Sequence, residues 1–175
     1  MPRSASTARP VRSDAGSERA RDRSRILLTG AIVLGVVALD QLTKAWVVAS
    51  LSDAPLEIIG NTVEFRLSRN TGGAFSLFQD FTPILAVLAV IVAVILVRVL
   101  HRTRDPVILI ALALILAGAI GNLIDRLVRS PGFLHGAVVD FVRVGSFPSF
   151  NVADSAITIG AVLLVVWGWR RPEPE

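Results

Sequence analysis

Long apolar stretches separated by short polar connections are the feature that most constrains the fold of this 175-residue chain. Hydrophobic residues make up 53% of the sequence. A helix of about 20 mainly apolar residues is long enough to cross the hydrocarbon core of a bilayer. The sequence therefore predicts an all-α membrane protein with four transmembrane helices, at about residues 26–48, 83–100, 107–124 and 151–169.

The basic residues predict how these helices are oriented. Residues 1–25 contain seven arginines and three acids, a surplus equal to the formal net charge of +4 of the whole chain. Further basic residues follow the second span at 98–104 and the fourth at 170–171. Basic flanking segments tend to stay on the cytoplasmic side. Both termini are therefore predicted to be cytoplasmic, and segments 49–82 and 125–150 extracytoplasmic.

The N-terminal segment 1–25 has almost nothing to bury, so a disordered basic cytoplasmic tail is predicted there. Nucleic-acid binding is a weaker interpretation, because a basic flank before an apolar run ordinarily sets topology. A cleaved signal peptide is disfavoured because no small-x-small cleavage site follows the apolar run. One compact domain at 26–169 and a short cytoplasmic tail at 170–175 complete the predicted organisation.

The sequence offers little support for thiol or metal chemistry. No cysteine is present, which excludes disulfides, thiolate nucleophiles and cysteine metal ligands. The two histidines, His101 and His135, lie far apart, and neither has a second histidine at metal-ligand spacing. A metal site is therefore not predicted.

The segment 49–82 has the pattern of a folded surface element. Apolar and polar residues alternate in the second half of 57–67, which favours a strand or a hairpin. Small, turn-forming residues follow at 70–76, and the adjacent Gly72 and Gly73 allow a backbone to approach a substrate closely. We predict a small sheet resting on the outer membrane surface.

Asp140 and Asp154 stand near the outer ends of apolar segments, where an ionisable side chain usually marks function. Gly145 and Pro148 between them permit the chain to fold back and bring the two carboxyl groups together. Two adjacent carboxyl groups share a proton, so one acts as a base and the other as an acid. Asp154, near a helix N-terminus, is expected to be the more acidic of the two.

Other polar residues admit structural explanations. Asn151 and Asp154 have the spacing of N-cap and N3 positions, which would explain both without catalysis. Asp40 and Lys44 are predicted to form an i, i+4 ion pair that braces the first span. Asn122 and Arg126 would share a helix face.

An alternative for this helix end is a surface pair between Asp125 and Arg126 beside packing glycines. In that case the segment would carry no site residue.

Five short motifs occur in the chain in this order: DQLTK at 40–44, NTGGAF at 70–75, GNLIDR at 121–126, VVDF at 138–141 and FNVAD at 150–154. Together they resemble the lipoprotein signal peptidase family, also called signal peptidase II, whose members are bacterial membrane aspartic proteases. The resemblance implies four transmembrane helices with a small extracytoplasmic β-cradle and a short amphipathic outer helix. It also implies a multi-pass protein of the bacterial cytoplasmic membrane with its active site on the extracytoplasmic face.

By this resemblance the substrates are diacylglyceryl-modified prolipoproteins, which are cut before the lipidated cysteine. Membrane lipids and globomycin-type inhibitors are further expected ligands, and no metal or organic cofactor is needed. Asp140 and Asp154 match the catalytic pair. The positions that match the substrate pocket are Asn70, Asn122, Arg126 and Asn151, and the supporting positions are Asp40, Lys44, Gly72, Asp125 and Ala153.

Two other classes of function remain open on sequence grounds. A small transporter or channel subunit would use acids as a proton relay through the bilayer. Four acids, Asp40, Asp125, Asp140 and Asp154, all fall at one side of the predicted bundle, which favours chemistry at the membrane surface. A structural assembly protein would use its acids only as caps and packing groups, and replacement of Asp140 by Asn would then be silent.

Overall fold

The computed structural model describes residues 14–60, 62–72 and 82–170. Within these ranges four helices are long and apolar enough to cross a membrane. They are α1 (Asp14–Ser50), α2 (Thr82–Arg102), α3 (Pro106–Val128) and α4 (Val152–Trp169). Three strands complete the described fold: β1 (Leu56–Ile59), β2 (Val63–Asn70) and β3 (Val138–Val144). The prediction of four transmembrane helices with a small sheet is confirmed.

Helix α1 begins at Asp14, well before the predicted start of the first span. The prediction of a disordered tail is therefore wrong for residues 14–25, while 1–13 lie outside the described residues. Arginine and alanine are good helix formers, so the helix of the span continues backwards through this segment. The Ser24 hydroxyl donates to the Ala20 carbonyl at 3.0 Å, and Arg25 pairs with Asp22 at 3.4 Å.

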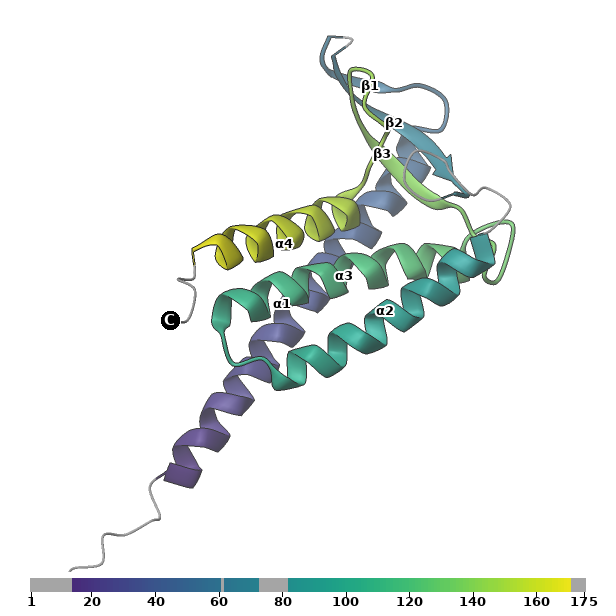
Figure 1. Cartoon of the computed structure of the whole chain (residues 1–175). Coiled ribbons are helices and arrows are strands. Elements are labelled where there is room, and N and C mark those ends of the chain that lie inside the picture. Colours follow the sequence, from purple (N-terminus) through teal and green to yellow (C-terminus); the bar gives the residue numbers. More distant parts are fainter. Residues whose placement is uncertain (1–13, 61, 73–81, 171–175) are drawn as a thin grey trace, which may run out of the picture.

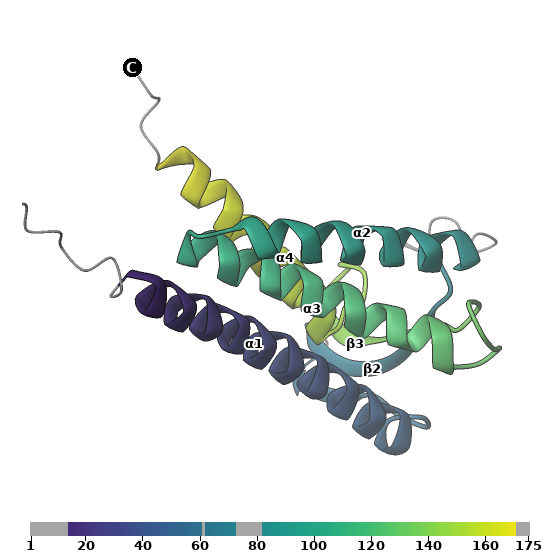
Figure 2. The same cartoon turned by 90° about the horizontal axis from the view of Figure 1, so that it is seen from below.

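Helix α3 lies at the centre of the bundle and contacts the other three helices (Figures 1 and 2). It is also the most buried of the four. Small residues let α4 approach it closely, because a methyl group at Gly118 would overlap the Ala153 carbonyl oxygen. Helix α3 continues to Val128, past the predicted end at 124, so Asp125 and Arg126 are helical.

Replacing Gly118 with Ala is expected to destabilise the protein by about 1–3 kcal/mol, because the added methyl group must push α3 and α4 apart. The melting temperature in detergent micelles measures this effect. Gly35→Ala is the matched control: Gly35 lies on α1 with nothing within 4 Å of a Cβ. If Gly118→Ala had the same melting temperature as Gly35→Ala, close packing of α3 and α4 at Gly118 would be contradicted.

The strands form one antiparallel sheet in the order β1-β2-β3. It lies at the end of the bundle opposite the start of α1 and the C-terminal end of α4 (Figure 1). A buried cluster of Val47, Val139 and Phe141 joins the sheet to the end of α1. Phe65 stacks edge-on against both Trp46 and Phe141. The strand or hairpin predicted within 57–67 is confirmed, whereas β3 was not predicted as a strand.

A separate amphipathic outer helix does not occur among residues 14–60, 62–72 and 82–170. Residues 73–81, including Gly73, lie outside the described part of the chain. The segment from 129 to 137 consists of turns and extended backbone, and it leads from α3 directly into β3.

Candidate active site

Asp140 is held on β3 with its side chain almost fully buried, at 3% exposure. β2 runs antiparallel to this strand, with Ser68 opposite Asp140 and Asn70 opposite Val138. This register brings the Asn70 side chain to the carboxyl group, where Nδ2 donates to Asp140 Oδ2 at 3.1 Å. The Asn151 amide donates to the other oxygen, Oδ1, at 2.7 Å. Both oxygens of Asp140 therefore accept a hydrogen bond from an asparagine.

Asp154 lies in the first turn of α4 and takes part in a capping box with Asn151. The Asn151 side chain accepts from the Asp154 backbone N–H at 2.9 Å, and Asp154 Oδ2 accepts from the Asn151 N–H at 3.2 Å. The second oxygen, Oδ1, accepts from Asn122 Nδ2 at 2.8 Å. The capping role considered from the sequence is thus present. It leaves Asp154 Oδ1 directed at Asn122 of α3, and Asp154 lines the same pocket as Asp140.

The connection between β3 and α4 folds back as predicted. Gly145 adopts a φ of +53°, a left-handed conformation that favours glycine. Phe150 then pairs with Val142 as an isolated bridge, with hydrogen bonds of 2.9 and 3.0 Å. This return places Asn151 and α4 directly beside β3, so that two acids fourteen positions apart in the sequence face one pocket.

The pocket has a volume of about 870 Å³ and two kinds of wall. The polar wall is formed by Asn70, Asn122, Arg126, Asp140 and Asp154. The rest of the lining is mainly apolar, and we call its apolar residues the apolar wall: Val138, Phe147, Pro148, Phe150, Ile157 and Ile159. A pocket of this kind accepts a ligand with a polar centre and an apolar arm.

Burial and the neighbouring Asp154 raise the pKa of Asp140 from 3.8 to about 7, against the lowering effects of Asn70, Asn151 and Lys44. A carboxyl group with such a pKa holds its proton for a large part of the time at neutral pH. It can therefore act as a proton donor where an ordinary aspartate cannot.

Asp140 is also expected to make stability depend on pH. Its folded-state pKa exceeds the unfolded value, so the folded chain binds more protons than the unfolded chain between these two values. Stability should therefore fall as the pH rises from about 4 to about 7, and this loss should be missing in Asp140→Asn. Melting temperatures of both proteins across this range measure it. A difference between them that is constant with pH would contradict the raised pKa.

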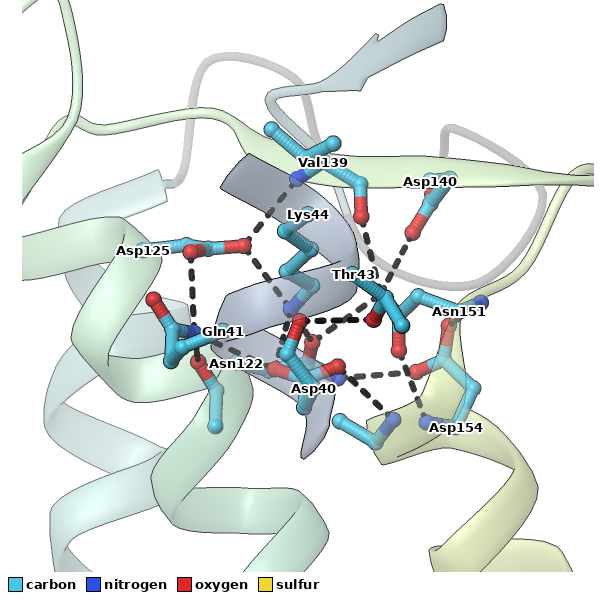
Figure 3. A network of polar contacts seen from close by, with 12 residues as sticks. Asp40, Gln41, Thr43, Lys44, Asn122, Asp125, Val139, Asp140, Asn151 and Asp154 are labelled. Carbon is cyan, nitrogen blue, oxygen red and sulfur yellow. Dashed lines mark hydrogen bonds and ion pairs between the residues drawn. The ribbon is translucent and has the colours of Figure 1, made fainter. Parts of the chain in front are cut away.

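A buried ionic cluster, formed by Asp40, Lys44 and Asp125, lies in the same polar network as the two acids (Figure 3). Lys44 Nζ lies 2.8 Å from Asp40 Oδ2 and 2.8 Å from Asp125 Oδ2. Arg129 Nε lies 2.7 Å from Asp125 Oδ1. The predicted Asp40–Lys44 pair is confirmed. The alternative of an exposed Asp125–Arg126 pair is wrong, because α3 continues past Asp125 and turns this side chain into the bundle.

Two of these acids also fix backbone groups next to the pocket. Asp40 Oδ1 accepts from the Ala153 N–H at 2.9 Å, which links α1 to the first turn of α4. Asp125 Oδ2 accepts from the Val139 N–H at 3.1 Å. Each contacted residue, Ala153 or Val139, immediately precedes one member of the acid pair. The supporting acids therefore set the positions of the backbones that carry Asp140 and Asp154.

Arg126 lines the pocket and connects α3 to the end of β2. Its guanidinium donates to the Asn122 carbonyl at 3.2 Å and to the Gly72 carbonyl at 3.3 Å. Gly72 is buried, and its N–H donates to Asn70 Oδ1 at 3.0 Å, which orients the Asn70 amide toward Asp140. Asn122 and Arg126 thus share a face of α3, as predicted.

Gln41 and Arg129 were not assigned to the site from the sequence. Gln41 Nε2 lies within 3.3 Å of acceptors on Asp40, Asp125 and Gly121. Arg129 follows Asp125 at i+4, a spacing that could have identified the pair. The contacts of Gln41 join α1 to α3 across 80 residues of sequence, and no local pattern reveals them.

Four apolar helices of membrane-spanning length define a multi-pass membrane protein, and two acidic side chains, Asp140 and Asp154, line one of its pockets. The family model described as signal peptidase (SPase) II matches residues 32–170, and the chain belongs to this family of aspartic endopeptidases. Its relatives are bacterial.

Curated relatives match over most of their length. The lipoprotein signal peptidase of Rhodococcus jostii is 48% identical over 152 residues, which cover 86% of this chain and 77% of the relative. The lipoprotein signal peptidase of Mycobacterium avium is 44% identical over 158 residues, which cover 90% of this chain and 86% of the relative. That of Streptomyces coelicolor is 42% identical over 159 residues, which cover 90% of this chain and 78% of the relative.

Solved structures show the same fold. A bacterial membrane enzyme determined by the in meso method has a TM-score of 0.74 and 29% identity, covering 86% of this chain and 94% of that chain. A second such structure has a TM-score of 0.72 at 29% identity and covers 84% and 96%.

Proposed function

We propose that this protein removes the signal peptide from diacylglyceryl-modified prolipoproteins by cutting before the lipidated cysteine, with Asp140 and Asp154 as the catalytic pair. One observation carries the proposal: the two acids reach a single pocket from β3 and α4, and that pocket has both a polar and an apolar wall. A peptide bond next to a lipid anchor presents the same two chemistries.

In this proposal Asp140 holds the proton at the outset, since its pKa is raised to about 7. Asp154 is the ionised member, because it lies in the first turn of α4, where the helix N-terminus favours a negative charge. Asp154 takes a proton from water as the water oxygen bonds to the scissile carbonyl carbon, and Asp140 donates to the carbonyl oxygen. As the carbon–nitrogen bond breaks, Asp154 passes the proton that it took from water to the cysteine amine, and a hydroxyl of the tetrahedral intermediate returns a proton to Asp140. Water thus supplies a hydroxyl to the signal peptide and a proton to the amine.

The neighbouring polar residues have distinct proposed roles. Asn70, Asn122 and Asn151 each donate to one of the two carboxyl groups, so they orient the acids. Asn70 and Asn122 also line the pocket, whereas Asn151 is fully buried and does not line it. Arg126 bonds only to backbone carbonyls in the described structure and supplies a cation at the pocket wall. We assign Arg126 to the peptide backbone of the substrate, which it would hold against the pair.

The apolar wall indicates how the lipid is accommodated. Ile159 of α4 lines the pocket and is 54% exposed, so the pocket opens onto a surface that faces hydrocarbon in a membrane. Acyl chains can remain in the bilayer while the peptide enters from the side. Membrane lipids would contact the same surface. Globomycin-type inhibitors are proposed to compete for this pocket.

The proposed orientation places the sheet and the pocket on the extracytoplasmic side. The start of α1, the α2–α3 connection and the end of α4 share the opposite end of the bundle (Figure 1). These regions contain most of the arginines that flank the helices, which favours a cytoplasmic location. Both termini would then be cytoplasmic.

Cleavage of one prolipoprotein in two forms, with and without the diacylglyceryl group, tests the proposed substrate class. The purified protein in detergent, with a chelator present, is expected to cut only the modified form. Equal cleavage of both forms would refute the requirement for lipid. Failure of well-folded protein to cut either form would refute the proposed activity.

A further inference from the structure

Lys44 contacts more than its two acidic partners. Its side chain is fully buried, and Nζ also donates to the Asn122 side-chain oxygen at 3.1 Å. The opposite end of that amide, Nδ2, donates to Asp154 at 2.8 Å. A continuous chain of two hydrogen bonds therefore leads from a buried cation on α1 through α3 to an acid on α4 (Figure 3).

The Asn122 amide must face one way for this chain to exist. The oxygen of an asparagine amide accepts hydrogen bonds and its nitrogen donates them, although the two ends have nearly the same shape. An ammonium group has only donors, so it fixes the oxygen toward itself and leaves the nitrogen for the carboxylate. Asn151 adds a second, neutral donor to the same oxygen at 3.1 Å.

We propose that Lys44 is a positioning residue for catalysis, which orients the Asn122 amide so that it holds Asp154 in its reactive geometry. This inference rests on the proposed function, because it takes Asp154 to be catalytic. Lys44 itself does not line the pocket and would not touch the substrate.

The charge balance of the cluster distinguishes this positioning role from a purely structural role in holding α1 against α3. Lys44 and Arg129 balance Asp40 and Asp125, so the ion pairs account for the buried charges by themselves. Bracing α1 against α3 does not require a contact with Asn122. The contact therefore connects Lys44 to Asp154 through the Asn122 side chain. A hydrogen bond from a charged donor is stronger than one from a neutral donor, so Lys44 fixes this amide more firmly than a neutral residue would.

The test compares K44M/D40N with D40N. The double variant removes one cation and one anion, so the interior stays neutral and Asp125 keeps Arg129 as its partner. The amide introduced by D40N retains an oxygen that can accept from the Ala153 N–H. The single variant D40N keeps Lys44 beside Asp125 and Asn122. The two variants differ only at residue 44, so the comparison measures the effect of the Lys44 cation when Asp40 is replaced in both proteins.

Removal of Lys44 is expected to lower kcat at least about tenfold relative to D40N, while KM changes less than about threefold. The acid limb of the pH profile should also move to higher pH, because a nearby cation favours the ionised acids. Other charged groups that face the pair are Asp40 from α1 and Asp125 and Arg126 from α3. Equal kcat and equal pH profiles in K44M/D40N and D40N would overturn the inference.

Three additional proteins make every outcome decisive. If K44M/D40N does not fold, K44Q/D40N replaces it, and a kcat at least about threefold below that of D40N supports the role whereas equality refutes it. Wild type and Asp154→Asn are assayed in parallel with the same modified prolipoprotein. Full activity of Asp154→Asn would refute the proposed function itself, whereas its inactivity leaves the Lys44 comparison as a separate test.

Discussion

Asp140→Asn and Asp154→Asn are each expected to reduce kcat by about 10²–10⁴-fold, the range over which a positioned acid or base acts in catalysis. Asparagine preserves the size of each side chain and keeps an oxygen that can accept from Asn151 or Asn122. It can neither take a proton from water nor hold one for the substrate. Cleavage of a diacylglyceryl-modified prolipoprotein by the purified variants measures the loss.

Asp53→Asn is the control for this pair of substitutions, since Asp53 is an exposed acid next to the sheet-bearing end of α1. It should cleave as wild type does. Protein abundance and melting temperature at low pH should be similar for all three variants. A well-folded Asp154→Asn protein with normal turnover would contradict the assigned pair.

Asp125→Ala is expected to destabilise the protein by about 3–5 kcal/mol, the cost of breaking a buried ion pair from one side. Asp125 is fully buried and pairs with both Lys44 and Arg129. Its removal also leaves the buried Val139 N–H without its acceptor. Thermal unfolding in detergent and the amount of protein in the membrane measure the effect.

Asp53→Ala is the matched control, because it removes an exposed acid, and it should leave the melting temperature nearly unchanged. Asp125→Asn should fall between the two, since an amide oxygen can still accept from Val139. An Asp125→Ala protein as stable as Asp53→Ala would show that the buried cluster does not secure β3 to α3.

Periodicity and composition predicted the elements that depend on local sequence. Four apolar runs of helical length predicted the four spans, and the alternation within 57–67 predicted the hairpin of β1 and β2. The i, i+4 spacing of Asp40 and Lys44 predicted their ion pair. Each of these signals lies within one short stretch of sequence, where spacing largely determines which side chains are neighbours.

The features that escaped prediction depend on contacts between distant segments. The acid of the pair on β3 lies in a short run rich in Val and Phe, and periodicity alone does not distinguish such a run from a buried helical segment. Its pairing with β2, a distant segment, shows it to be a strand. Asp125 looked like the exposed end of a helix, yet Lys44 from α1 makes it part of the core. Residues 14–25 looked like a tail because polarity predicts exposure, and an exposed segment can still be helical.

The most direct test of the account is a single-turnover cleavage of a diacylglyceryl-modified prolipoprotein in water enriched in the heavy oxygen isotope, with chelator present. The masses of both products and of the enzyme are then measured. The account predicts one cut, immediately before the lipidated cysteine, and one heavy oxygen in the new carboxyl group of the signal peptide. A cut elsewhere, or heavy oxygen incorporated into Asp140 or Asp154 through a covalent intermediate, would contradict the activation of water by this pair.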